Sequence, residues 1–220
     1  LGGDGGGSPT TRRNASLRDS LTGLVAAIRA FVDAPRLKQM SLCVVAHLLG
    51  DGQADSISWL FRYIARNSWR VTAKRLEERL VESGAEVPED LDRLFEAADL
   101  GEPASMDYIE FLAAALIFRP ELYCDRPVLR AAYRFLDAAD DGIVTGQSVH
   151  ALMPDLSEEE CTALIHEACG ETAMTFQDFE LFMAADEAAC TSAHDAAASP
   201  AFSAAEAEPC GGGGGGASPS

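Results

Sequence analysis

A helix–loop–helix pattern that recurs four times is the feature that most limits how this chain can fold. Each unit has apolar residues at helical spacing, then a polar loop, then a second apolar helix. The loops end at Arg75, Glu110, Ser148 and Asp178, so successive loop ends are 30 to 38 residues apart. Recurrence at such a period is typical of an array of like units. We predict an all-α fold of four units in two lobes; the alternative is a loose helical bundle with coincidental spacing.

The third loop matches an EF-hand calcium loop in part. Such a loop supplies side-chain oxygens at positions 1, 3 and 5, a backbone carbonyl at position 7 and a bidentate carboxylate at position 12. Asp137, Asp141 and Ile143 fit positions 1, 5 and 7. Ala139 at position 3 and Ser148 at position 12 do not fit. We therefore predict that any Ca²⁺ binding centres on Asp137 and Asp141 and is weak.

The first two loops have lost more of these ligands. The second loop keeps Asp99 at position 1 and Glu110 at position 12, but residues without ligating side chains stand at positions 3, 5 and 6. The first loop has Ala65 at position 1, is one residue short and ends in Arg75, a cation where the metal needs an anion. We predict no calcium in the first loop and at most weak binding by Asp99 and Glu110 in the second.

The fourth loop offers carboxylates but an imperfect geometry. Glu167, Glu171 and Asp178 stand at positions 1, 5 and 12, with Cys169 at position 3. Aspartate at position 12 is shorter than glutamate and reaches an ion less well. Because calcium takes 6 to 8 oxygens, none of the four loops supplies a full set of ligands from its side chains.

An apolar residue at position 8 of each loop predicts how the units pair. In paired EF-hands this residue forms a short antiparallel bridge with its counterpart in the neighbouring loop. The four residues are Val71, Met106, Val144 and Met174. We therefore expect Val71 opposite Met106, and Val144 opposite Met174.

Composition disfavours several classes of function. The 220 residues carry a formal net charge of -18, which disfavours nucleic acid because its phosphates repel such a surface. The longest apolar run, from Phe111 to Phe118, is too short to span a membrane. Six cysteines without a CxxC pair favour reduced thiols in a cytoplasmic protein. Because the chain starts with Leu1 and not Met, we expect a fragment or a processed product.

Two amphipathic helices precede the array and carry basic charge. Apolar residues recur at helical spacing from Leu21 to Val32 and again from Leu37 to Leu48. Residues 1–50 have a net charge of +3, within an acidic chain. A basic amphipathic helix tied to an acidic helical domain is similar to a calmodulin-type target joined to its receptor. The alternative is that both are ordinary core helices with solvated arginines.

Three stretches resemble the regulatory tail of calcium-dependent protein kinases. Residues 30–49 are similar to the junction helix of that family, and residues 108–114 and 176–179 are similar to the closing segments of its second and fourth EF-hands. The resemblance runs from about Leu21 to Asp186 and implies a calmodulin-like domain. It also implies that calcium loading makes the lobes wrap the junction helix and lifts inhibition of a kinase domain.

The chain itself has no kinase catalytic motif, so we predict that it is not an enzyme and that any kinase domain lies upstream. The expected partner is its own junction helix, Arg36–Leu49, or a basic amphipathic helix of a partner, with a kinase domain as a further candidate. Two hypotheses stand. One is a regulatory module with at most weak calcium binding; the other is a metal-independent interaction domain of EF-hand shape.

The predicted organisation has five parts. The Gly-rich start and the Ala-, Ser- and Gly-rich end are too poor in apolar residues to fold, so both are expected to be disordered. The parts are a disordered tail (1–18), the junction helices (19–50), an N-lobe pair (51–118), a C-lobe pair (119–187) and a second disordered tail (188–220).

Overall fold

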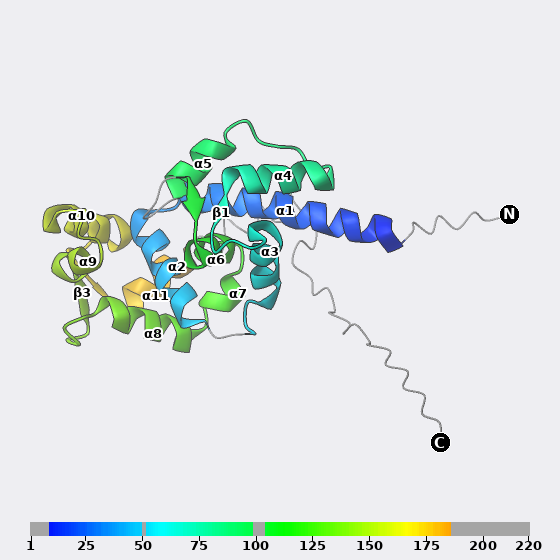
Figure 1. Cartoon of the computed structure of the whole chain (residues 1–220). Helices are drawn as coiled ribbons and strands as arrows, with labels where there is room; N and C mark the ends of the chain where they lie inside the picture. Colours follow the sequence, from blue (N-terminus) through cyan, green and yellow to red (C-terminus); the bar gives the residue numbers. More distant parts are fainter. Residues whose placement is uncertain (1–8, 50–51, 99–103, 186–220) are drawn as a thin grey trace, which may run out of the picture.

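The computed structural model describes residues 9–49, 52–98 and 104–185, which form eleven helices and two small sheets (Figure 1). The helices are α1 (Pro9–Asp33), α2 (Arg36–Leu48), α3 (Asp55–Ala65), α4 (Ala73–Ser83), α5 (Leu91–Ala98), α6 (Tyr108–Leu116), α7 (Pro120–Tyr123), α8 (Arg126–Leu136), α9 (Gly146–Leu152), α10 (Glu158–Cys169) and α11 (Phe176–Ala184). The strands are β1 (Val71–Thr72), β2 (Ser105–Met106), β3 (Ile143–Thr145) and β4 (Ala173–Thr175). The prediction of a mostly helical chain is confirmed.

The four predicted units are present as helix–strand–helix segments that join in twos. Strand β1 pairs antiparallel with β2 and places Val71 opposite Met106, while β3 pairs with β4 and places Val144 opposite Met174. Both predicted registers are confirmed. All four side chains are fully buried, so each bridge also belongs to the core. We call the segment from α3 to α6 the first pair, and the segment from α8 to α11 the second pair.

The second helix of every unit begins with the same local signal. The N-cap is the last residue of the strand or, in the second unit, the residue directly after it, and its side-chain oxygen accepts a backbone N–H of the first turn; the caps are Thr72, Asp107, Thr145 and Thr175. Such a cap satisfies an N–H that has no partner within the helix. Helix α4 ends at Gly84, whose left-handed φ of 71° glycine adopts without strain.

Helix α1 is longer than the sequence suggested. We expected residues 1–18 to be disordered, whereas α1 starts at Pro9, and proline is well suited to the first turn because that N–H needs no partner. Leu17 is partly buried against the core, so the helix has apolar support before Leu21. The remaining residues of both predicted tails, 1–8 and 188–220, lie outside the described residues.

Helix α2 lies between the two pairs, as Figure 1 shows. It contacts α6 of the first pair and α8 and α10 of the second, and nine of its thirteen residues are buried. Gln39 fixes the turn that leads into it, because its Nε2 atom lies within hydrogen-bond distance of the carbonyls of Phe31, Val32 and Ala34 at the end of α1. The predicted apolar face is buried at Leu37 but not at Leu48, which is 44% exposed because it lies at the end of the helix.

Within the described residues, no helix has both the length and the apolar character needed to span a bilayer.

Candidate functional site

The side chain at position 12 of three loops is engaged in helix capping. Glu110 accepts the N–H of Asp107 at 2.8 Å, Asp178 accepts the N–H of Thr175 at 2.9 Å, and Ser148 accepts that of Thr145 at 3.4 Å. Position 12 is therefore the third residue of the helix, where a glutamate or a similar side chain completes a capping box. The hydroxyl and then the backbone N–H of Thr175 lower the pKa of Asp178.

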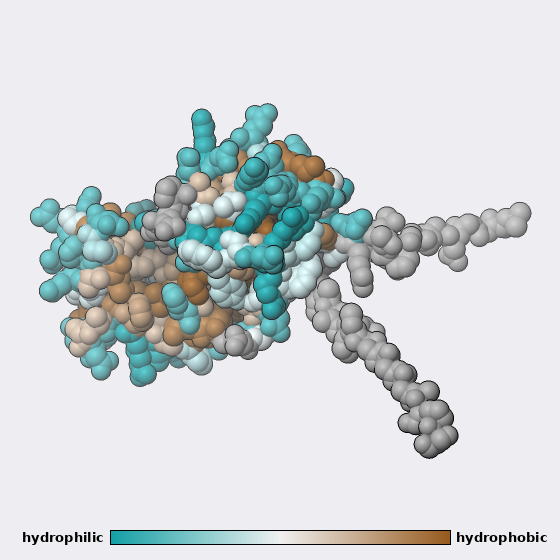
Figure 2. Space-filling model, viewed as in Figure 1, coloured by the Kyte–Doolittle hydropathy of each residue, from teal (hydrophilic) through white to brown (hydrophobic). Residues whose placement is uncertain are grey.

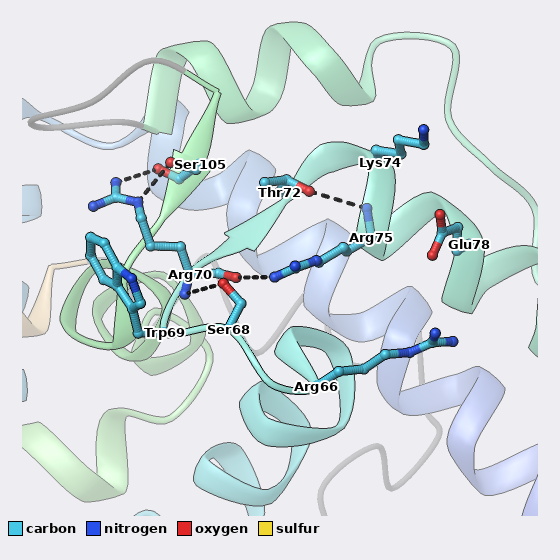
Figure 3. A pocket seen from close by; sticks show the side chains of 9 residues that line it. All are labelled: Arg66, Ser68, Trp69, Arg70, Thr72, Lys74, Arg75, Glu78 and Ser105. Atoms are coloured by element: carbon cyan, nitrogen blue, oxygen red, sulfur yellow. Dashed lines mark hydrogen bonds between the residues drawn. The ribbon is translucent and has the colours of Figure 1, made fainter.

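In the first loop, the residue at position 12 places a cation inside the loop. The Nη1 atom of Arg75 donates to the carbonyl of Ala65 at 3.2 Å. It also donates to the carbonyl of Arg70 at 3.0 Å (Figure 3). Val71 pairs with Met106 in the bridge and therefore stands at position 8 of the first loop. The carbonyl of Arg70 is then the position 7 oxygen that a calcium ion uses in an EF-hand. The guanidinium thus takes over a metal ligand, and its charge opposes a second cation there.

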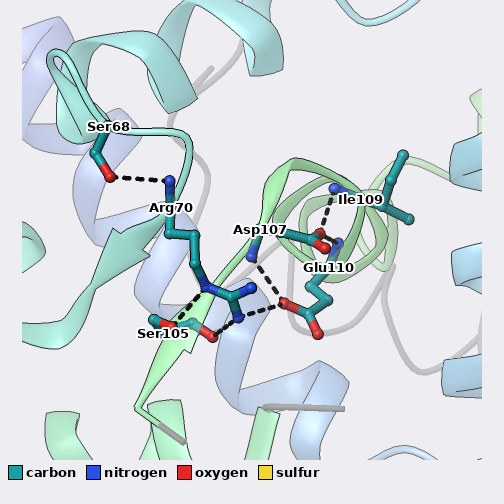
Figure 4. A network of polar contacts seen from close by, with 6 residues as sticks. All are labelled: Ser68, Arg70, Ser105, Asp107, Ile109 and Glu110. Atoms are coloured by element: carbon teal, nitrogen blue, oxygen red, sulfur yellow. Dashed lines mark hydrogen bonds and ion pairs between the residues drawn. The ribbon is translucent and has the colours of Figure 1, made fainter. Parts of the chain in front are cut away.

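In the second loop, a cation arrives from the first loop. The guanidinium of Arg70 donates to the carbonyl of Ser105 at 2.9 Å and to its hydroxyl at 2.7 Å, and lies 3.6 Å from the carboxylate of Glu110 (Figure 4). Ser105 and Glu110 stand at positions 7 and 12. Both side chains of the ion pair are largely buried, at 14% and 10% exposed, so solvent screens it little. Asp99, the other predicted ligand, lies outside the described residues.

The third loop keeps its predicted oxygens close together but uses them internally. Asp137 is only 6% exposed, and its carboxylate accepts the N–H groups of Asp141 at 3.3 Å and Gly142 at 2.9 Å. Asp141 accepts the N–H of Ile143 at 3.0 Å. A buried hydroxyl ties this loop to the fourth, because Tyr133 lies 2.8 Å from the carbonyl of Gly142 and 2.9 Å from that of Met174.

The fourth loop has a thiol at its centre. Cys169 Sγ lies 3.3 Å from the carbonyl of Ile165 and 3.9 Å from those of Glu171 and Ala173. Ala173 stands at position 7 of that loop, so this carbonyl too faces a protein group. Glu167 and Glu171, the other carboxylate residues of the loop, are exposed.

In the described part of the first pair, guanidinium groups contact the carbonyls of Arg70 and Ser105 and lie beside Glu110, so these oxygens do not suit a calcium ion. Those of the third loop fit in part: Asp137, Asp141 and the carbonyl of Ile143 are oxygen donors, but a full shell takes 6 to 8 of them. Among the described residues, no three His, Cys, Asp or Glu side chains are grouped so as to hold a metal.

Helix α2 is held by a buried lysine as well as by apolar contacts. Lys38 is 1% exposed, and its Nζ atom lies 3.2 Å from the carbonyl of Met183 in α11. Arg36, two residues earlier, lies 3.3 Å from the side-chain oxygen of Gln39. On the same helix, burial and then the nearby carboxylate of Glu110 raise the pKa of Cys43 to about 12.

The sequence reasoning missed Arg70 and the burial of Lys38. A signal for Arg70 was present: it precedes the bridge residue Val71, so the bridge brings its side chain beside the second loop. No comparable signal marks Lys38, which on a helical pattern is an ordinary polar position next to Leu37.

Four bridged units around an additional buried helix are consistent with a calmodulin-like region. The proteins of similar sequence are calcium-dependent protein kinases. Calcium-dependent protein kinase 3 of Plasmodium berghei is 27% identical over 119 residues, 53% of this chain and 21% of that protein. Calcium-dependent protein kinase 11 of Oryza sativa is 29% identical over 126 residues, 56% of this chain and 22% of that protein. For calcium-dependent protein kinase 33 of Arabidopsis thaliana the values are 26% over 136 residues, 61% and 26%.

The chain is thus a distant homologue of the C-terminal, regulatory region of calcium-dependent protein kinases. It spans about a fifth to a quarter of the length of these relatives, which is consistent with a non-catalytic region. No protein-family model matches the chain. A solved C-terminal domain covers 73% of the chain at 18% identity with a TM-score of 0.37, a likeness too low to support an argument.

Proposed function

We propose that this chain is a regulatory module of the calmodulin-like type, in which two EF-hand pairs hold the chain's own helix α2. The observation that carries the proposal is the position of α2, which contacts helices of both pairs and buries nine of its thirteen residues. Fully burying a side chain such as Leu37 or Leu42 stabilises the docked state by roughly 1.5–3 kcal/mol. The contact between Lys38 and Met183 adds a directed bond to the second pair.

In this proposal the first pair works without metal. Arg75 and Arg70 supply, as parts of the chain, the positive charge that calcium supplies in an EF-hand. A ligand shifts an equilibrium only by its different affinity for the two states. Because calcium has few oxygens left to bind in the first pair, calcium should change the contact between the first pair and α2 only a little.

Calcium is assigned a minor role at the third loop. Asp137, Asp141 and the carbonyl of Ile143 are the donors that remain, and a shell this incomplete fits weak, millimolar-type binding. The alternative function, a metal-independent interaction domain of EF-hand shape, is favoured by the arginines of the first pair. The two functions differ in whether the third loop binds calcium at all; in both, α2 stays docked.

The proposed target is a kinase domain, in keeping with the names of the relatives. In this scheme the docked α2 represents one state of the module, and a kinase domain or a basic amphipathic helix of a partner competes for it. The acidic chain, with a formal net charge of -18, suits such a basic partner.

Hydrogen exchange tests the docking of α2 and the role of calcium together. We expect strong protection of Arg36–Leu48 in chelator and the same protection in excess calcium. A charge placed at buried Leu37 (L37D) should abolish the protection, whereas L48D, at a position that is 44% exposed, should leave it in place. Weak protection in the parent chain would reject the docked helix. A large change on adding calcium would instead reject the metal-independent function and restore a calcium switch.

A further inference from the structure

A basic pocket lies over the first loop, on the side of the molecule where hydrophilic side chains gather around α3 and α4 (Figure 2). Its volume is about 510 Å³, and its lining includes Arg66, Trp69, Arg70, Lys74, Arg75 and Glu78 (Figure 3). Four of these side chains are cationic and one is a carboxylate. Such a local excess of positive charge is unexpected in a chain with a net charge of -18.

Two of the four cations are structural, and two face solvent. Arg70 and Arg75 donate to loop carbonyls and hold positions inside the pocket wall. Arg66 and Lys74 are exposed. Arg66 lies 3.3 Å from Glu82, but both side chains are about half exposed, and such surface pairs contribute little and exchange partners readily. No partner of Lys74 is found within the described residues.

An exposed aromatic ring borders the same pocket. Trp69 is 70% exposed, although an indole is among the side chains that gain most from burial. The guanidinium carbon of Arg70 lies 5.2 Å from the centre of its ring, so the cation helps to orient the indole. The ring lies beside Arg70, across the pocket from Lys74 and Arg66, and offers contact to the organic part of an anionic ligand (Figure 3).

We propose that this pocket binds a phosphate monoester, with the phosphate facing Lys74 and Arg66 and the organic group resting on Trp69. Guanidinium and ammonium groups form their strongest hydrogen bonds with phosphate and carboxylate oxygens. A phosphate dianion carries more charge than a carboxylate and so suits a pocket that is lined by several cations. A loop that binds a cation in an EF-hand has here become a site for an anion. The proposal stands on the pocket and does not depend on the regulatory function proposed above.

Fluorescence of Trp69 provides a direct test. The chain has two tryptophans, so a W59F background leaves Trp69 as the only indole. Titration at constant ionic strength with inorganic phosphate, O-phosphotyrosine, a phosphothreonine peptide and adenosine monophosphate should give a saturable change for at least one monoester. Stronger binding of the nucleotide identifies a nucleotide ligand, whereas stronger binding of the phosphoamino acids identifies a phosphorylated side chain.

A matched pair of charge reversals decides whether the pocket is responsible. K74E should weaken the best monoester by at least about tenfold, the effect of losing one charge-assisted contact of roughly 1.4 kcal/mol. Lys74 is exposed in the first turn of α4, where an acidic residue suits the helix, so this variant should fold normally. R134E makes the same charge change on α8 and should leave binding unaltered. No saturable response to any monoester, or equal weakening by K74E and R134E, would overturn the proposal.

Discussion

The first and second pairs share one topology but hold their loops together with different chemistry. In the first pair, two guanidinium groups contact the carbonyls at position 7 of both loops and also the carboxylate at position 12 of the second loop. In the second pair, the hydroxyl of Tyr133 and the thiol of Cys169 contact loop carbonyls. A cation that is part of the chain cannot dissociate, whereas neutral groups leave carboxylates such as Asp141 at the surface. We therefore expect the bridge of the first pair to form without metal, and any response to metal to come from the second pair.

The largest expected effect is on the alkylation rate of Cys43. This residue belongs to α2, the helix that contacts both pairs. Burial, followed by the carboxylates of Glu110 and Asp107, raises its pKa to about 12 from an ordinary value of 9.0. Only the thiolate is alkylated, so at pH 8 Cys43 should react about 1000-fold more slowly than an unperturbed thiol. The rate should rise about tenfold per pH unit up to pH 12, because the thiolate fraction grows with pH below the pKa.

Mass spectrometry of iodoacetamide-treated protein, digested into peptides, measures this rate. Because the first pair does not fit calcium, the rate should be equal in chelator and in excess calcium. The L37D variant should approach the rate of an ordinary thiol, since undocking α2 removes the burial. If Cys43 of the parent chain already reacts at the ordinary rate, α2 is not docked in solution.

The second expected effect is a loss of stability when the cation that joins the two loops of the first pair, Arg70, is removed. Arg70→Met keeps much of the apolar stem but leaves Glu110 without its largely buried ion-pair partner and the Ser105 carbonyl without a donor. Removing one partner of a buried pair costs about 3 kcal/mol of unfolding free energy. Urea unfolding monitored by circular dichroism measures the loss. R134M, at an exposed position on α8, should change stability by less than about 0.5 kcal/mol, and equal losses in both variants would contradict the role of Arg70.

Sequence periodicity was sufficient for the units and their pairing but not for the contents of the loops. The position 8 residues predicted both bridges because an apolar side chain in a polar loop stays exposed to water unless a neighbouring loop covers it. Ligand counting also predicted, from Arg75, that the first loop is unsuited to calcium, and Arg75 donates to two carbonyls of that loop. The role of Arg70 was not predicted because it depends on the neighbouring loop, whereas the ligands were counted within one loop at a time. Lys38 was not predicted because the Met183 carbonyl that it contacts lies 145 residues away in the sequence.

The third expected effect contrasts repair of a loop in each pair. Ser148→Glu restores the two-oxygen ligand at position 12 of the third loop and keeps a residue that suits the capping box. Calcium affinity should rise at least about tenfold, equivalent to roughly 1.4 kcal/mol. Arg75→Glu makes the same repair in the first loop but should give no binding, because that loop lacks a carboxylate at position 1 and is one residue short.

Calorimetric titration with calcium, and with magnesium as a second ion, distinguishes these outcomes. Binding that appears in the Arg75→Glu variant at the level of the Ser148→Glu variant would show that the arginines alone had kept calcium out of the first pair. An unchanged affinity in the Ser148→Glu variant would mean that the third loop does not have EF-hand geometry.

The smallest expected effect is the removal of the hydroxyl that links the loops of the second pair. Tyr133→Phe keeps the ring that packs edge-on against Phe176 at 5.4 Å, but the carbonyls of Gly142 and Met174 lose their shared donor. Burial and then the charge of Asp137 raise the pKa of Tyr133, so in the parent chain the hydroxyl keeps its proton at neutral pH and remains a donor. The loss should be about 1 kcal/mol, less than for Arg70→Met, because a neutral hydrogen bond contributes less than a buried charged one.

Tyr63→Phe is the matched control, since the hydroxyl of Tyr63 has no hydrogen-bond partner within the described residues while its ring stacks on Trp59. It should change the unfolding free energy by less than about 0.5 kcal/mol. Hydrogen exchange adds the location: the Tyr133→Phe variant should lose protection at β3 and β4 while β1 and β2 keep theirs, because the arginines hold the bridge of the first pair independently. Equal loss of protection at both bridges would mean that the two pairs unfold as one unit and that the difference in their chemistry does not make them separately stable.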